Sequence, residues 1–196
     1  MFFVIILLAL SYFGYSSTKK HNVKKQAESR IQELPSFSFF NLNEELFTYQ
    51  NIEKEETLLI YFHPDCEHCQ YEAKQIVLNK EKFKETQIIM ISPASLLAIN
   101  QFNKTYELNK IKNLEVLWDK ERKFENYFGV ATFPTILIYD DENQLQKKHK
   151  GEVKIEAILK ELKIKEETIS SRLEPNNNMF NKFNSLINVQ LFLFKL

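Results

Sequence analysis

A chain of 196 residues with 44% hydrophobic residues and 17 phenylalanines can bury the core of one globular domain and still carry extensions. Its 26 basic and 26 acidic residues cancel, so no excess of positive charge points to nucleic acid as a partner. The chain has three glycines, which excludes a glycine-rich phosphate loop and a dinucleotide-binding fingerprint.

The chain begins with an almost wholly apolar segment, FFVIILLALSYF at residues 2–13. Even if it is extended to Tyr15, this segment is shorter than the ~20 residues that an upright membrane helix needs. Its length and position are typical of the hydrophobic region of a secretory signal. We therefore expect residues 1–17 to be a signal peptide or an uncleaved signal anchor in contact with the membrane. We expect the protein to work in the cell envelope, anchored or secreted to the periplasmic or extracytoplasmic side.

Two observations keep other interpretations of this segment open. Four lysines follow it, and the positive-inside tendency would retain them in the cytoplasm: Lys19, Lys20, Lys24 and Lys25. A hydrophobic first helix that packs against its own domain would also fit the pattern. Residues 18–34 are mostly polar with a thin helical stripe, so we expect a solvated tether there.

From residue 35 to residue 165, short β-rich runs alternate with segments of helical periodicity. The predicted strands are 37–40, 46–49, 57–62, 87–92, 114–118, 135–139 and 145–150, and the predicted helices are 66–83, 94–108, 120–128 and 153–163. This order indicates an α/β domain whose central sheet is mixed, because its first two strands and its last two strands form hairpins. In such sheets, chemistry gathers at the carboxyl ends of the parallel strands.

The only two cysteines, Cys66 and Cys69, follow the predicted buried strand 57–62. Asp65 is the expected N-cap of the next helix, which places Cys66 in its first turn. Side chains three residues apart share a helix face, so the two sulfurs can meet. Unpaired backbone N–H groups and the positive end of the helix dipole favour the thiolate of Cys66, which is the nucleophilic form.

This arrangement indicates a redox centre. Cys66 would attack the disulfide of a partner protein, and Cys69 would resolve the mixed disulfide. His68 lies between them and, when protonated, would add positive charge beside the thiolate. A Cys-x-x-Cys pair is also half of a zinc site, but the sequence has no second Cys-x-x-Cys and no His-x-x-x-His to complete it. Inert buried cysteines are a further alternative.

A proline at the start of the predicted strand 135–139 is the second element of the expected site. A proline at the mouth of a strand normally serves only to remove a ladder donor. A cis Phe133–Pro134 bond would instead turn the preceding backbone toward the cysteines. Because about one X-Pro bond in twenty is cis in folded proteins, composition alone does not decide between the two.

The order of these features resembles the thioredoxin fold, over about residues 35–165. The resemblance rests on a strand, Cys66-Glu-His-Cys69 and a helix, followed by Thr-Phe-Pro-Thr at 132–135 before a strand, a turn, another strand and a glycine that leads into a helix. The extra helix and strand within residues 94–118 are similar to the inserted αβ unit of the TlpA/ResA-like branch of redoxins. The apolar start and tether also match the layout of that branch.

This resemblance implies a thioredoxin-like fold, with an N-terminal β-hairpin and a central mixed sheet flanked by helices. It implies a membrane-anchored or secreted thiol–disulfide oxidoreductase of the protein-disulfide reductase type, active in cell redox homeostasis, that requires no cofactor. The expected partners are protein dithiol or disulfide substrates and a membrane or periplasmic dithiol protein that donates electrons.

The resemblance also implies roles for particular residues. Phe133 would offer its backbone to an extended substrate segment beside the cis Pro134. Glu67 and Glu72 match the Cys-Glu-x-Cys-x-x-Glu pattern of the branch, which makes Glu72 a candidate acid or base near Cys69. The alternative for Glu72 is a surface carboxylate in a salt bridge.

The sequence departs from the family in three places. Ile60 replaces the buried aspartate of ordinary thioredoxins, Asp65 replaces the tryptophan before the first cysteine, and His68 replaces the proline between the cysteines. The branch implies a reductant, whereas a histidine at position 68 stabilises the reduced form and implies a more oxidising couple. The direction of electron flow stays open.

Two other functions compete with this one. A peroxidase of the same superfamily would require threonine or serine three residues before the reactive cysteine, where His63 stands. A copper or zinc carrier, or a redox-inert thioredoxin-like binding module, is the alternative from another class.

The last 31 residues, 166–196, form a tail to which the resemblance does not extend. A breaker at residues 175–178 (PNNN) precedes an apolar end. This tail could pack on the domain, touch a membrane or have no function.

Overall fold

The computed structural model describes residues 28–53, 56–130 and 132–162. The predicted signal segment, most of the predicted tether and the tail 166–196 lie outside the described residues. All the strands below, and the helices that precede residue 150, belong to the compact unit that ends at Glu161. Within the described part of the chain, none of the helices has the length and apolar character needed to cross a membrane.

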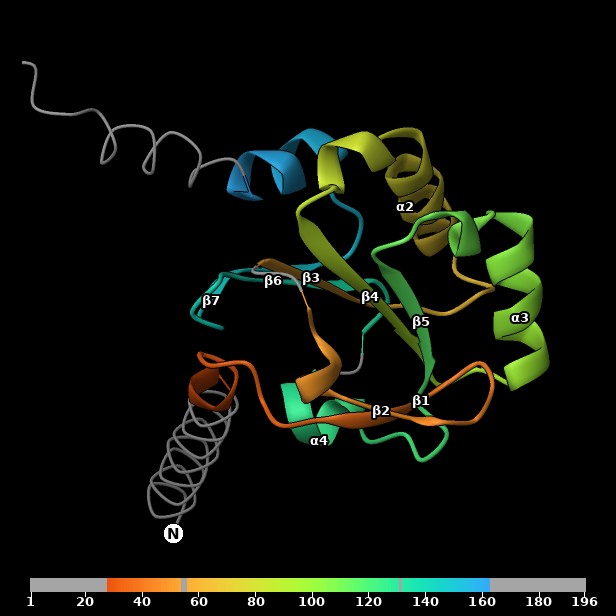
Figure 1. Ribbon diagram of the computed structural model, residues 1–196, viewed down its shortest axis with the longest axis horizontal. Coiled ribbons are helices and arrows are strands. Elements are labelled where there is room, and N and C mark those ends of the chain that lie inside the picture. The colour runs from red at the N-terminus through yellow and green to blue at the C-terminus, as the bar shows by residue number, and fades with distance from the viewer. Residues whose placement is uncertain (1–27, 54–55, 131, 163–196) are drawn as a thin grey trace, which may run out of the picture. The chain divides into compact units, whose positions relative to one another are not determined.

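Seven strands of the described residues form one mixed sheet in the order β2-β1-β5-β4-β3-β6-β7 (Figure 1). They are β1 (Ser38–Asn41), β2 (Leu46–Thr48), β3 (Glu56–Tyr61), β4 (Thr86–Ser92), β5 (Leu114–Trp118), β6 (Thr135–Tyr139) and β7 (Leu145–Lys150). Strands β3, β4 and β5 are parallel, whereas β1 with β2 and β6 with β7 are antiparallel hairpins. This confirms the predicted thioredoxin-like α/β fold with a mixed sheet.

Helices cover both faces of the sheet. The longer helices α2 (Glu67–Leu78) and α3 (Leu96–Thr105) lie on one side, and α4 (Phe124–Phe128) lies on the other (Figure 1). A further helix covers residues 155–162. Short 3-10 turns connect these elements at Tyr49–Asn51, Lys80–Phe83 and Leu108–Lys110.

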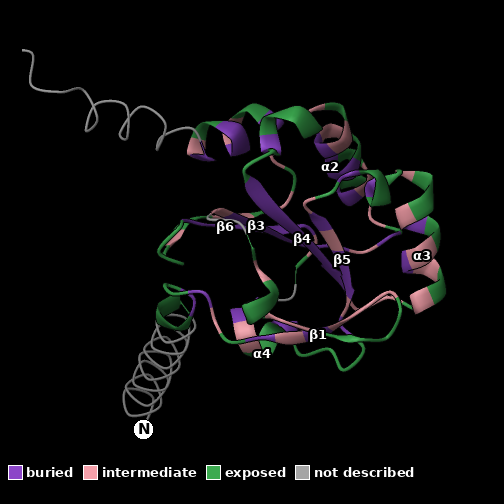
Figure 2. Ribbon diagram, viewed as in Figure 1, coloured by how far each residue is buried: buried purple, intermediate pink, exposed green. Residues whose placement is uncertain are grey.

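The inner strands are buried on both faces, which explains their continuous apolar runs. Figure 2 shows β4 buried along its whole length. At the end of β3, the Tyr61 ring stacks on Phe124 of α4, with ring centroids 3.8 Å apart. The next residue, Phe62, faces the other side and contacts Phe102 of α3 at 4.7 Å. Packing on both faces therefore fixes the point from which the cysteine loop departs.

The helix that follows the cysteines is shorter than predicted. The sequence predicts a single helix over 66–83, but α2 ends at Leu78 and a separate 3-10 turn follows. Asn79 makes this break, because its side-chain amide donates to the carbonyl of Gln75 while its backbone N–H also bonds back into the helix.

The last residues of the predicted tether pack onto the domain. Ile31 is 1% exposed and its carbonyl accepts a hydrogen bond from the Tyr139 hydroxyl at 3.2 Å. The Leu145 N–H donates to the carbonyl of Gln32 at 2.7 Å. Residues 31–34, at the end of the segment expected as a mostly solvated tether, therefore lie along the β6–β7 hairpin.

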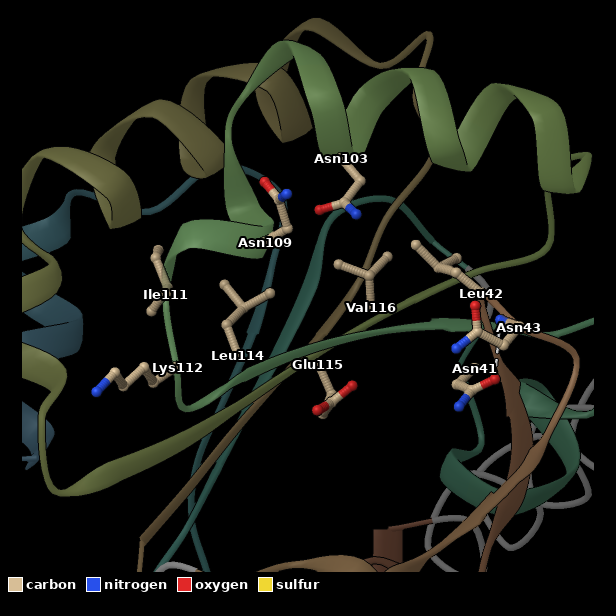
Figure 3. A pocket seen from close by; sticks show the side chains of 10 residues that line it. All are labelled: Asn41, Leu42, Asn43, Asn103, Asn109, Ile111, Lys112, Leu114, Glu115 and Val116. Atoms are coloured by element: carbon tan, nitrogen blue, oxygen red, sulfur yellow. Dashed lines mark hydrogen bonds between the residues drawn. The ribbon is translucent and has the colours of Figure 1, made fainter.

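A hollow of about 300 Å³ opens between α3 and the start of β5 (Figure 3). Its polar lining includes four asparagines: Asn41, Asn43, Asn103 and Asn109. None of the predicted site residues lines it. Because β3 and β5 run in the same direction, the start of β5 lies at the opposite edge of the sheet from the cysteines that follow β3.

Candidate active site

The two cysteines lie where β3 gives way to α2, as predicted, but the helix begins one residue later. Cys66, not Asp65, is the N-cap, and the Cys69 N–H donates to its Sγ at 3.4 Å. The Asp65 side chain is 89% exposed and caps nothing. The sulfur of Cys66 therefore takes the place that a capping oxygen usually occupies, in direct contact with an otherwise unpaired helix amide.

The two thiols have different surroundings. Both are free, Cys66 is half-buried, and Cys69 is fully buried. Burial raises the pKa of the Cys69 thiol far above its ordinary value, and its hydrogen bond with Cys66 raises it further. Cys66 is thus the more accessible thiol, whereas the thiol of Cys69 holds its proton more tightly than an ordinary cysteine does.

Glu72 lies one helical turn beyond Cys69 and is completely buried. Its Oε1 accepts a hydrogen bond from the Val153 N–H at 2.7 Å, and its Oε2 is buried without a hydrogen-bond partner among the described residues. Burial raises the pKa of Glu72 to about 7, despite the opposing hydrogen bond from Val153. The alternative of an exposed carboxylate in a salt bridge is therefore wrong.

His68 lies on the outer side of the motif. Its Nδ1 is 2.5 Å from Oε2 of Glu152, and the two side chains are 64% and 43% exposed. The carboxylate accepts the hydrogen bond, so Nδ1 is the donor. The carboxylate of Glu152 therefore offsets the effect that a positive charge on this imidazole would have on Cys66.

The Phe133–Pro134 peptide is cis, which confirms the prediction made from the sequence. Thr135, the next residue, pairs with Tyr61 at the end of β3, so the proline loop lies at the same edge of the sheet as the cysteines. The Phe133 ring contacts the rings of Tyr61 and His63, with centroids 4.8 and 5.5 Å apart. Ala131, at the start of this loop, lies outside the described residues.

Sequence reasoning missed two residues of the site, Glu152 and Val153. They follow β7 and contact His68 and Glu72 over more than 80 positions of sequence. No motif or periodicity marks them, because a contact over this distance depends on how β7 and the motif helix are placed in space. Within the described ranges, no group of three or more His, Cys, Asp or Glu side chains is arranged to hold a metal ion.

Comparison with protein families matches residues 31–148, more than half of the chain, to the AhpC/TSA family. No curated protein matches the chain.

Many solved structures share this fold. A secreted disulfide oxidoreductase of Mycobacterium tuberculosis is 17% identical, with a TM-score of 0.57 over 68% of this chain and 96% of its own. An exposed lipoprotein thioredoxin of Streptococcus pneumoniae is 21% identical, with a TM-score of 0.52 over 65% and 98%. A thiol peroxidase from Chromobacterium violaceum is 17% identical, with a TM-score of 0.58 over 70% and 87%. At these identities the similarity concerns the fold.

Proposed function

This chain belongs to the AhpC/TSA family, and from that membership and the geometry of its cysteines we propose that it is a thiol–disulfide oxidoreductase acting on protein substrates. The observation that carries the proposal is the Cys66 sulfur at the start of α2, bonded to the Cys69 amide. The cis Phe133–Pro134 peptide, at the same edge of the sheet, supports it.

In the first step, the Cys66 thiolate attacks one sulfur of a substrate disulfide. A bond forms between that sulfur and Cys66, the substrate disulfide breaks, and its other sulfur leaves as a thiolate that takes a proton from water. The Cys69 N–H at the start of the helix donates to the attacking sulfur. Phe133, beside the cis Pro134, offers its backbone to the extended substrate segment that carries the disulfide.

In the second step, Cys69 resolves the mixed disulfide. Its thiol passes a proton to Glu72, whose Oε2 carries no competing hydrogen bond from the described residues. The Cys69 thiolate attacks Cys66, the substrate leaves as a thiolate that is protonated, and the enzyme holds a Cys66–Cys69 disulfide. A pKa of about 7 suits Glu72 to this exchange, because it can both accept and return a proton near neutral pH.

We propose the reductase direction, with a membrane or periplasmic dithiol protein restoring the reduced enzyme. The pairing of His68 with Glu152 supports this direction. The negative charge of Glu152 opposes the stabilisation of the Cys66 thiolate by which a histidine at this position would make the couple oxidising. The reduction potential of the Cys66–Cys69 couple tests this direction of electron flow. A potential near those of strong oxidants would show that the enzyme oxidises its substrates instead.

We also propose export, with residues 1–17 as signal peptide or anchor. The apolar start of the chain supports it, as does the similarity of fold to an oxidoreductase described as secreted and a thioredoxin described as an exposed lipoprotein. The metal-carrier alternative would need further ligands, and among the described residues none joins the two cysteines.

Trapping of substrates tests the proposed chemistry. In a Cys69→Ser variant the second step cannot occur, so mixed disulfides through Cys66 should accumulate and dissociate when a reducing agent is added. The Cys66→Ser/Cys69→Ser double variant is the control and should trap nothing. If Cys69→Ser traps no protein in the compartment where the chain resides, the oxidoreductase proposal is wrong.

A further inference from the structure

Residues 151–153, which connect β7 to the helix at 155–162, contact the redox centre at three points. The first is the Gly151 N–H, which donates to the Pro134 carbonyl at 2.8 Å. Gly151 has a φ of 84°, in the left-handed region that favours glycine. No atom lies within 4 Å of the position that a Cβ would take there, so the requirement for glycine is conformational.

The other two contacts are with α2. Oε2 of Glu152 accepts from Nδ1 of His68 at 2.5 Å, and the Val153 N–H donates to Oε1 of Glu72 at 2.7 Å. Three consecutive residues therefore each bond to a different part of the centre: the proline loop, the residue between the cysteines and the buried carboxylate.

We propose that Glu152 is a positioning residue of the redox centre, whose carboxylate is held by His68 next to the Val153–Glu72 contact and there tunes Glu72 as the proton acceptor of Cys69. The inference rests on the proposed function and deepens it.

The loop acts on Glu72 through two opposing effects. The Val153 amide donates to the carboxylate and favours its charged form. The Glu152 carboxylate repels that charge and raises the pKa of Glu72, in addition to the larger effect of burial. Among the described residues, Cys69 on the same helix also interacts with Glu72, and Glu152 itself contacts His68. The loop thus balances an attractive amide against a repulsive carboxylate.

The second step can be observed separately from the first. When the fully reduced protein reacts with dithiobis-nitrobenzoate, attack by Cys66 releases one thionitrobenzoate and leaves another attached to Cys66. Attack by Cys69 then forms the Cys66–Cys69 disulfide and releases the second. The rate of this second release as a function of pH reports the proton acceptor of Cys69.

We expect Glu152→Gln to move the midpoint of this pH profile down, by on the order of 0.5 pH unit, since a half-exposed carboxylate is partly screened by water. Val153→Pro removes the amide donor and should move the midpoint up. Opposite shifts from neighbouring residues cannot arise from general loss of structure. Glu156→Gln is the matched control, since it removes a nearby exposed carboxylate, and it should leave the profile unchanged.

The inference is wrong if Glu152→Gln retains the wild-type midpoint, or if Glu152→Gln still shifts the profile in a Glu72→Gln background. Should Val153→Pro fail to fold, the Glu152→Gln shift alone decides. A wild-type protein that releases only one thionitrobenzoate would refute the proposed redox function itself, and this inference with it. A wild type that releases both, with a Glu152→Gln profile that does not move, refutes only the role of Glu152.

Discussion

At the scale of single residues, the centre depends on a carboxyl group kept away from water. Glu72 has no exposed surface and holds one hydrogen bond, to the Val153 amide. A buried group of this kind binds its proton more tightly in the folded chain than in the unfolded chain. Its protonation state therefore contributes to stability as well as to chemistry.

This contribution predicts a pH dependence of stability. Between about pH 4.5, the ordinary pKa of the glutamate, and about pH 7, its pKa in the folded protein, the folded chain keeps a proton that the unfolded chain has lost. The free energy of unfolding should therefore fall as pH rises through this window, by roughly 3 kcal/mol from this group.

Urea unfolding of the reduced protein at several pH values measures this, with Glu72→Gln as the comparison. The glutamine does not titrate, so the stability difference between the two proteins should change across the window and be constant above it. A constant difference over the whole range would show that the carboxyl group is already ionised in the folded protein.

Residue chemistry was the most predictable part of the site. The pairing of Cys66 with Cys69 follows from local sequence, because it depends on spacing and on a neighbouring strand. The cis bond before Pro134 follows from the family resemblance, because composition alone does not decide it. The burial of Glu72 could not be deduced from its helix alone, since it depends on Val153 and the loop that covers it. The same applies to the bond between His68 and Glu152.

At the scale of elements, α4 shows how one side chain decides where a helix begins. Asp119 is 1% exposed, and its two carboxylate oxygens accept from the N–H groups of Lys123 at 2.7 Å and Phe124 at 3.0 Å. The sequence predicts a helix from residue 120, but α4 begins at Phe124. The hydrophobic periodicity of the sequence indicates that a helix exists. Where the helix starts depends on which side chain accepts hydrogen bonds from its first free amides.

Removal of this carboxylate should therefore loosen α4. Asp119→Ala leaves two amide groups at the helix start without their acceptor, and we expect the free energy of unfolding to fall by about 2 kcal/mol. Asp119→Asn keeps one acceptor oxygen and should cost less. Urea denaturation gives both values, and equal losses for the two variants would mean that packing, not capping, is responsible.

At the scale of the whole molecule, the sequence predicted the α/β class and the hairpins at both edges of the sheet. It placed the start of the domain at residue 35, whereas packing extends at least to Ile31, which is 1% exposed. A short polar segment with few apolar residues has too weak a pattern to reveal this contact. The hydrogen bond from Tyr139 that holds it comes from a strand over 100 residues away.

The buried segment should therefore contribute to global stability. Ile31→Ala in the full chain removes buried apolar volume, and we expect a loss of about 2 to 4 kcal/mol in the free energy of unfolding. Leu46→Ala is the matched control, because Leu46 is 62% exposed and its truncation should cost about 0.5 kcal/mol or less. Equal losses for the two variants would place residues 31–34 outside the cooperative unit.

The lysines of β7 affect how this protein can associate with other protein chains. The strand ends the sheet on one side and carries Lys147, Lys148 and Lys150, while the opposite border, β2, is three residues long. Charged or very short borders discourage strand-to-strand association between molecules. A protein that handles incompletely folded clients meets many exposed strands, and these borders would leave the Phe133–Pro134 loop as the place where an extended substrate segment binds.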